Sequence, residues 1–307
     1  MQGHTPTPVF SVRDKRNLLF IILGLVPAAA LAFWLHILPV FQGLYLSLFR
    51  WSGLSPKRKF VGLANFRALA NDSLVWKALG HDVYMVVFRL TAVIVLALLF
   101  AGILHFSSRR KQKIVQGLFF FPNVLSVAVV GIIFTFIYNP SIGALNAILT
   151  NLGLENLTQA WLGNPKTAFP AVLFPTVWGA VGYQMLLLFA GMSSIPKAYT
   201  EVALLEGATR IQEFFQVTLP LLRNVVKTCV SLVVINTLNR TFIFIRVMTK
   251  GGPNDATEVL GNYMFYQGFE NFKFGYATSI AVINFTLALV LTFVVTRLLK
   301  KENLEYA

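Results

Sequence analysis

Long apolar runs with almost no charge constrain this chain more than any other feature of its sequence. A helix needs about 20 mostly apolar residues to cross a bilayer, and six stretches approach or exceed that length. They are Leu18–Leu44, Val83–Phe106, Ile114–Ile137, Phe169–Met192, Leu221–Val247 and Tyr276–Leu299. None of them alternates in polarity as the strands of a membrane barrel do. The sequence therefore predicts an all-α polytopic membrane protein with six transmembrane helices.

The composition excludes several other classes of protein. Of the 307 residues, 56% are hydrophobic and only 12% are charged, whereas a soluble domain has about 25% charged residues. Cys229 is alone, so no internal disulfide can form, and neither it nor the four His residues fit a metal-ligand spacing. We therefore expect no metal site. The net charge of +14 comes from basic residues beside apolar runs, which indicates anionic lipid headgroups rather than nucleic acid.

The first apolar run could be a cleaved signal peptide, because Arg13, Lys15 and Arg16 precede it and small residues follow at 28–32. The run continues through Leu38, however, beyond the 7–15-residue core of a cleaved signal. We therefore expect an uncleaved first helix within residues 18–49, preceded by an N-terminal tail at 1–17.

The distribution of Lys and Arg predicts the orientation only weakly. Six crossings place the tails 1–17 and 300–307 on one side, and that side carries slightly more of the 26 basic residues. The four cations at 109–113 resist translocation, whereas Lys57, Arg58 and Lys59 argue for the opposite orientation. The prediction is cytoplasmic termini, with an extracytoplasmic loop at 50–82 that forms a short helix or a folded loop. Turn residues at 139–143 and 251–254 end two further runs, and a short interfacial helix is expected at 144–152.

The segment 195–220, between the fourth and fifth runs, has the pattern of two short helices. Pro196 suits the first turn of a helix, and Gly207 suits its end because glycine tolerates a left-handed backbone. A second helix is predicted from Arg210 to Val217, ending before Pro220. Such a pair can project from a bundle and insert into the groove of a partner.

This segment resembles the EAA loop of the membrane subunits of ABC-type importers. The family pattern is Glu-Ala-Ala, three residues, Gly, nine residues, then Ile-x-Leu-Pro. The residues in register are Glu201, Ala203, Gly207, Val217, Leu219 and Pro220. Val202 replaces the usual Ala, and Glu206 stands where Asp is common. The segments 60–66, 161–165, 178–196, 249–257 and 269–277 also resemble carbohydrate-type permeases of this group.

The resemblance implies a type I ABC importer permease (MetI-like) fold, with a core at 83–299 and a coupling loop at 195–220. It implies no catalytic residues and no cofactor in this chain: ATP and Mg would be used by two separate ATPase subunits. No phosphate-binding loop occurs in the sequence. The implied partners are a second permease, expected to be a different chain, and an extracytoplasmic solute-binding protein. The implied location is the bacterial cytoplasmic (inner) membrane, where the chain crosses several times.

The resemblance also assigns the coupling to the ATPase. The candidate residues are Tyr199, Glu201, Ala203, Glu206, Gly207, Ala208, Leu219 and Pro220. Glu201 is expected to pair with a cation of the ATPase or to cap local amides, and the alternative is a solvated helix charge.

Polar side chains at membrane depth are costly, so they often mark a translocation path. The candidates are Asn123, Tyr183, Gln184, Asn236, Asn239 and Arg240. Amides, hydroxyls and aromatic rings suit a carbohydrate-like solute. The alternative is that these residues form interhelical hydrogen bonds worth about 0.6–2 kcal/mol each. Arg240 could bind a phosphate or carboxylate of the solute or extend to the outer face. Arg89 is expected to extend from near a helix end to the membrane surface.

Two other classes of protein remain as alternatives. A secondary transporter or channel would couple to an ion gradient, but the scarcity of acidic residues within the apolar runs disfavours it. An intramembrane enzyme would need a catalytic cluster near an interface, and only His81 with Asp82 approaches one. Co-purification of an ATPase subunit would distinguish the importer from both.

Overall fold

The computed structural model describes residues 15–298 and is helical apart from one small sheet. Strand β1 (Phe49–Arg50) pairs antiparallel with β2 (Lys59–Phe60). Within the described residues, five helices are long and apolar enough to cross a membrane, or six if one bent pair is counted as a span. The predicted all-α membrane fold is confirmed.

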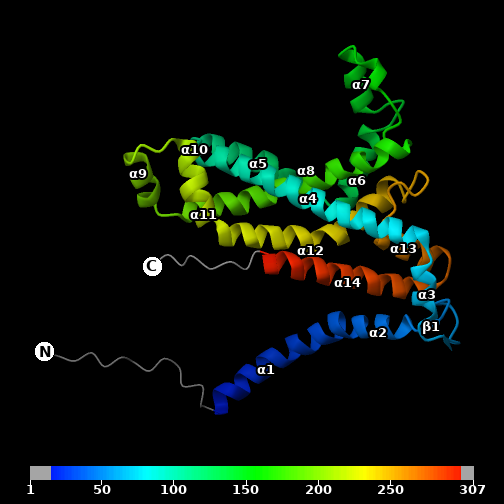
Figure 1. Cartoon of the computed structure of the whole chain (residues 1–307). Helices are drawn as coiled ribbons and strands as arrows, with labels where there is room; N and C mark the ends of the chain where they lie inside the picture. Colours follow the sequence, from blue (N-terminus) through cyan, green and yellow to red (C-terminus); the bar gives the residue numbers. More distant parts are fainter. Residues whose placement is uncertain (1–14, 299–307) are drawn as a thin grey trace.

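Four long helices form the bundle. These are α4 (Ser73–His105), α8 (Pro165–Ser194), α12 (Arg223–Met248) and α14 (Phe274–Leu298). Helix α12 contacts each of the other three, and α4 contacts α8 (Figure 1). Shorter elements gather at the two ends of the bundle. The first turn of α1 and the last turn of α14 lie at the same end, as an even number of crossings requires (Figure 1).

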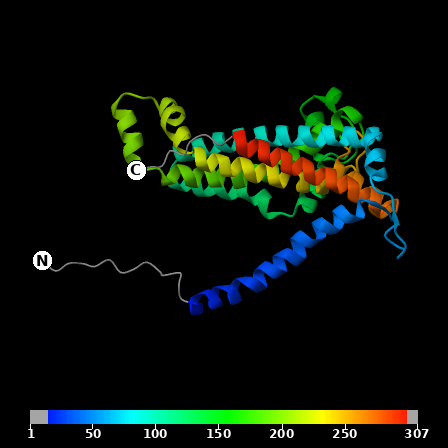
Figure 2. The ribbon, with the colours of Figure 1, turned by 60° about the horizontal axis from the view of Figure 1, so that its bottom comes forward.

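The first span stands apart from this bundle. It consists of α1 (Lys15–Ala32), the π-helical η1 (Phe33–Ile37) and α2 (Leu38–Leu46). Helix α2 contacts α14, whereas α1 leaves the bundle in both views (Figures 1 and 2). None of the residues in the most apolar stretch of Leu23–Leu46 is buried. This span therefore leaves most of its apolar surface uncovered.

The third predicted span, Ile114–Ile137, is wrong as a single straight helix. Two helices occupy this segment, α5 (Arg109–Val124) and α6 (Val127–Ile137), and they meet at an angle of 97°. Pro122 lies in the last turn of α5, where its ring disfavours regular helix. Ser126 then begins α6, because its hydroxyl accepts a hydrogen bond from the Val129 amide at 3.3 Å.

The second predicted span begins too late. Helix α4 begins at Ser73 rather than Val83, and Asp72 caps it by accepting a hydrogen bond from the Leu74 amide at 3.0 Å. Residues 50–82 therefore contain the β1–β2 hairpin, helix α3 (Ala64–Ala70) and the first turns of α4. Polar side chains in the first turns of α4 contact the segment after α12. Asp82 Oδ2, for example, accepts a hydrogen bond from the Leu260 amide at 2.9 Å.

Several short elements cover the end of the bundle that carries β1. They are α7 (Ala144–Asn151), the 3-10 helix η2 (Glu155–Leu157), α13 (Leu260–Phe265) and the π-helix η4 (Tyr266–Glu270). The helix expected at 144–152 corresponds to α7. The turn after α12 is tight, with Lys250, Gly251, Asn254 and Asp255 all at positive φ.

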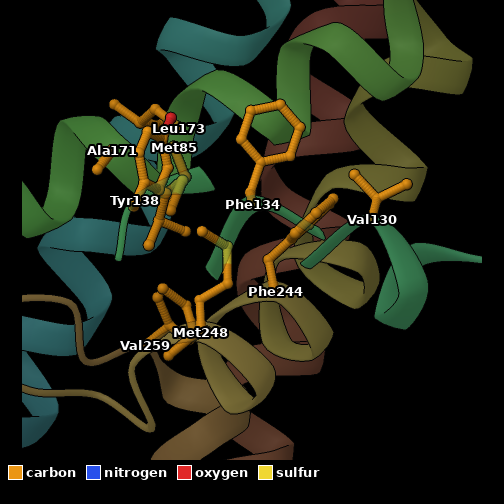
Figure 3. Packing of buried hydrophobic residues seen from close by; sticks show 11 residues of the cluster. Met85, Val130, Phe134, Tyr138, Ala171, Leu173, Phe244, Met248 and Val259 are labelled. Atoms are coloured by element: carbon orange, nitrogen blue, oxygen red, sulfur yellow. The ribbon is translucent and has the colours of Figure 1, made fainter. Parts of the chain in front are cut away.

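A cluster of buried apolar side chains ties the bent segment to the bundle at this end. Phe134 from α6, Leu173 from α8 and Phe244 from α12 belong to it, together with Met85 from α4 (Figure 3). Val259, just before α13, completes it. Helix α6 is therefore held by packing on α8 and α12, although its axis departs from that of α5.

Candidate functional site

The segment between α8 and α12 projects from the end of the bundle opposite β1 (Figure 1). It contains α9 (Lys197–Leu205), α10 (Arg210–Glu213), the π-helix η3 (Phe214–Thr218) and α11 (Leu219–Leu221). Gly207 has φ +87°, and a Cβ added there would meet nothing within 4 Å. The glycine is therefore required by the left-handed backbone and not by lack of space. The predicted arrangement of helix, glycine turn and helix is confirmed.

The predicted end of the second helix is wrong. The chain stays helical from Arg210 to Leu221, with a π-helical section between two α-helical ones. Pro220 lies in the first turn of α11, where its missing N–H breaks no regular helical bond. The second helix thus runs past Pro220 almost to the start of α12.

All eight candidate coupling residues lie on this projection. Tyr199, Glu201 and Glu206 are exposed, and so are Gly207 and Pro220. Ala203, Ala208 and Leu219 are half-buried. Large apolar neighbours are exposed beside them, above all Leu205, which is 87% exposed. The projection therefore combines acidic side chains with an uncovered apolar surface.

One residue of this projection was not identified from the sequence. Glu213 is 1% exposed, and its Oε1 accepts hydrogen bonds from Thr200 at 3.2 Å and from Thr218 at 2.6 Å. Its Oε2 has no partner among the described residues. The carboxylate joins α9 to η3, so it fixes the angle between the two halves of the projection. An acidic residue in a short, water-side helix gave no signal that it would be buried.

Basic residues surround the base of the projection. A cavity of about 530 Å³ lies there, and its lining includes His105, Arg109, Lys197 and Arg210. The basic segment at 109–113 therefore begins at the same end of the bundle as α9. Two features that were expected on the cytoplasmic side lie together.

A second, polar cavity of about 270 Å³ lies between the long helices. Five of the six candidate path residues line it. They are Asn123, Tyr183, Gln184, Asn236 and Arg240. Asn239 is exposed and is not part of the lining. The cavity lies near the middle of α4, α8 and α12, beside the last turn of α5.

Arg89 also lines this cavity, so the expectation that it extends to the membrane surface is wrong. The residue is 2% exposed and lies in the middle of α4. Its Nε donates to the Thr176 carbonyl and its NH1 group to Thr237 Oγ1, both at 3.1 Å. The guanidinium therefore joins α4 to α8 and to α12.

Hydrogen bonds show which of the cavity-lining candidates also hold helices together. Asn123 donates to the Gly179 carbonyl at 3.1 Å and so joins α5 to α8. Asn236 donates to Leu232 in its own helix at 2.8 Å. Gln184 is 5% exposed, and its Oε1 has no partner among the described residues. A purely structural role therefore accounts for Asn123 but leaves the Gln184 carbonyl unexplained.

The chain is similar to known membrane transport proteins. The sequence pattern of the family described as "Binding-protein-dependent transport system inner membrane component" matches residues 93–302. The "Probable ABC transporter permease protein YurN" of Bacillus subtilis is 35% identical, covering 95% of this chain and 99% of that protein. The "Diacetylchitobiose uptake system permease protein NgcF" of Streptomyces coelicolor is 33% identical, covering 93% and 84%.

A solved structure shows the same fold. It is a bacterial alginate ABC transporter in complex with a periplasmic protein that carries an alginate pentasaccharide. The TM-score is 0.80 at 20% identity, covering 94% of this chain and 98% of the other. The helical bundle and the extended sequence similarity thus lead to one conclusion: the chain belongs to the family of binding-protein-dependent transport system inner membrane components, the permease subunits of ABC importers.

Proposed function

We propose that this permease forms, with a second permease, the path by which an ATP-driven importer moves a carbohydrate-like solute into the cell. The observation that carries the proposal is the projection α9–α11, an apolar and acidic surface at one end of the bundle whose two halves are joined by the hydrogen bonds of Glu213. NgcF, whose name states diacetylchitobiose uptake, supports a carbohydrate as the class of solute. The polar cavity at the middle of the bundle provides amides and a phenol for such a solute.

The projection would carry the motion of the ATPase subunits to the cavity. ATP and Mg are bound by those subunits and not by this chain. Helix α9 contacts η3, η3 contacts α11, and α11 contacts α12. Helix α12 carries Asn236 and Arg240 into the cavity. Closure of the ATPase dimer would therefore shift the bundle between inward and outward openings through differential contacts at α9.

The surfaces that are uncovered in this chain suit the remaining partners of the proposed importer. The uncovered first span would pack against the second permease, a different chain, and against lipid. The end that carries α3, α7 and α13 would face an extracytoplasmic solute-binding protein, as supported by the alginate transporter, whose structure contains a periplasmic protein. Both termini would then be cytoplasmic, and the chain would reside in the inner membrane.

Site-directed cross-linking tests the docking surface. A Leu205→Cys variant in a Cys229→Ala background, labelled with a thiol-reactive photo-cross-linker in native membranes, should capture an ATPase subunit that mass spectrometry identifies. Ile142→Cys is the matched control, because this residue is exposed and belongs to the segment between α6 and α7. Helix α7 lies at the opposite end of the molecule (Figure 1). Capture of no ATPase at Leu205→Cys, or equal capture at both positions, would contradict the proposal.

A further inference from the structure

The polar cavity has an unbalanced charge. Arg89 and Arg240 both line it, and its lining contains no Asp or Glu. The ion pair found within the described residues, Arg246 with Glu270, lies elsewhere, at the end of α12. The cavity therefore has two positive charges without a carboxylate to neutralise them.

The hydrogen bonds of Arg89 neither neutralise its charge nor involve all of its N–H donors. A guanidinium has five N–H donors. Two are directed at neutral acceptors, the Thr176 carbonyl and the Thr237 hydroxyl. Neither acceptor is an anion, so the buried charge is solvated only by dipoles. A buried cation at membrane depth is costly unless something further compensates it, and such residues mark ion or substrate sites.

Arg240 adds a second positive charge to the same space. Its side chain is half-buried, and its charge repels that of Arg89. Two like charges that face one cavity are each destabilised by the other, whereas an anion between them would be attracted by both. Guanidinium groups also match carboxylate and phosphate geometry with paired hydrogen bonds.

Neutral polar groups complete the site. The Gln184 Oε1 is buried without a partner among the described residues, so it can accept a hydrogen bond from a hydroxyl group. Tyr183 and Asn236 line the same space. The volume of about 270 Å³ lies just below the ~300–1,000 Å³ of typical ligand pockets, so it suits one small ring rather than a long chain.

We infer that this cavity binds an acidic carbohydrate unit, a polyhydroxylated solute with a carboxylate, phosphate or sulfonate group. Arg240 contacts the anionic group, Arg89 attracts it from the wall, and Gln184 accepts from a hydroxyl. The inference names the solute class of the permease and so rests on the proposed function.

The positive potential can be measured without knowing the solute. The intact importer would carry Asn236→Cys in a Cys229→Ala background, and the rates of modification by an anionic and a cationic methanethiosulfonate reagent would be compared. Both rates would be normalised to Thr228→Cys, an exposed position on the same helix outside the cavity. The anionic reagent should be favoured by tenfold or more, and Arg240→Gln should reduce that preference several-fold. Equal normalised rates would overturn the inference.

Protection from this modification tests the solute class. Galacturonate and glycerol 3-phosphate are the anionic probes, and galactose is the neutral one, all at the same concentration. At least one anionic probe should slow the modification of Asn236→Cys several-fold more than galactose does, and Arg240→Gln should abolish the difference. Equal protection by galactose, or none by either anion, would contradict an acidic solute. The same preparation is also tested for cross-linking of an ATPase subunit at Leu205→Cys. That result tests the proposed function independently of the solute class.

Discussion

At the scale of single residues, the half-buried carboxylate of Asp72 joins three helices at the end of the bundle that carries β1. Asp72 Oδ2 accepts hydrogen bonds from Tyr263 at 2.7 Å and from Tyr276 at 2.6 Å. Burial opposes ionisation of this carboxyl, but the two phenols and the Leu74 amide outweigh it, so the pKa of Asp72 lies below its ordinary value. The ionised carboxylate therefore ties the start of α4 to α13 and α14.

Replacing Asp72 should weaken this junction. Asp72→Ala removes the acceptor of two phenol hydrogen bonds, which should lower the stability of the purified complex by about 1–2 kcal/mol. The carboxyl has a lowered pKa in the folded state, so its contribution is present above the unfolded value and is lost as the pH falls through the folded pKa. Thermal unfolding should therefore separate variant and wild type at pH 7, and the difference should shrink only at a pH well below 3.8, the ordinary pKa of an Asp. Asp72→Asn keeps one acceptor and should fall between them; identical melting of all three would contradict this role.

The contribution of Glu258 to stability should depend on pH in the opposite direction to that of Asp72. Burial raises its pKa to about 6, although Asn262 and the Val259 amide donate hydrogen bonds to it. The folded state therefore favours the protonated form, and stability falls as the pH rises from the unfolded value through about 6. Glu258→Gln should stabilise the complex at pH 7.5 by up to about 2 kcal/mol.

The pH dependence of unfolding provides the measurement for Glu258. The loss of stability between about pH 4.5 and 6 should disappear in Glu258→Gln. Glu155→Gln, at an exposed position of η2 whose charge does not act on Glu258, is the control and should leave this pH dependence unchanged. A less stable Gln variant at pH 7.5 would show that the charged form is the favoured one.

At the scale of elements, helices α5 and α8 pack backbone against backbone. A Cβ added at Gly182 would lie 1.7 Å from the Phe119 carbonyl oxygen, whereas one added at Gly179 would meet nothing within 4 Å. Small residues allow such close approach between membrane helices. The two glycines lie on one helix and so form a matched pair.

Gly182→Ala should separate α5 from α8. The backbone must move to admit the methyl group, at a cost of at least about 1–3 kcal/mol, and the yield and melting temperature of the purified complex should fall. Gly179→Ala should leave both nearly unchanged. Equal behaviour of the two variants would mean that the helices are not in contact at Gly182.

The projection α9–α11 depends on one backbone conformation, that of Gly207 at φ +87°. Val at position 207 costs about 1–2 kcal/mol or more in the left-handed region, whereas Asn tolerates it. Gly207→Val should therefore weaken ATPase docking or uncouple ATP hydrolysis from transport while the chain remains in the membrane, and Gly207→Asn should retain most coupling. Uptake and ATPase rates in proteoliposomes check both. Normal coupling in Gly207→Val would count against the role of the loop.

Hydropathy predicted where the spans lie but not how they bend. Averaged over 20 residues, the apolar segment Ile114–Ile137 hides the break after Val124. Pro122 followed by Ser126 was a local signal for a helix end and a new N-cap, and it could have been used. Asp72 is likewise a local N-cap signal for the early start of α4. Hydropathy does not reveal that start, because polar residues of the first turns are satisfied by a segment nearly 180 positions away.

At the scale of the whole molecule, the predicted start of α4 at Val83 misplaced Arg89. A helix that begins at Val83 puts Arg89 near an end, where it could reach the membrane surface. The observed start at Ser73 puts it in the middle, facing the cavity. The other cavity residues were predictable as polar groups at membrane depth. Which of them face one another depends on the rotation of α4, α8 and α12, which the sequence does not encode locally.

The composition of the native assembly distinguishes an ATP-driven importer from a transporter that works alone. The tagged chain would be purified in mild detergent from its native membrane, and every co-purifying protein would be identified and quantified. Stoichiometric amounts of an ATPase subunit and of a second, different permease are the predicted result. A homo-oligomer of this chain that transports solute without ATP would show that the protein is not part of an ATP-driven importer.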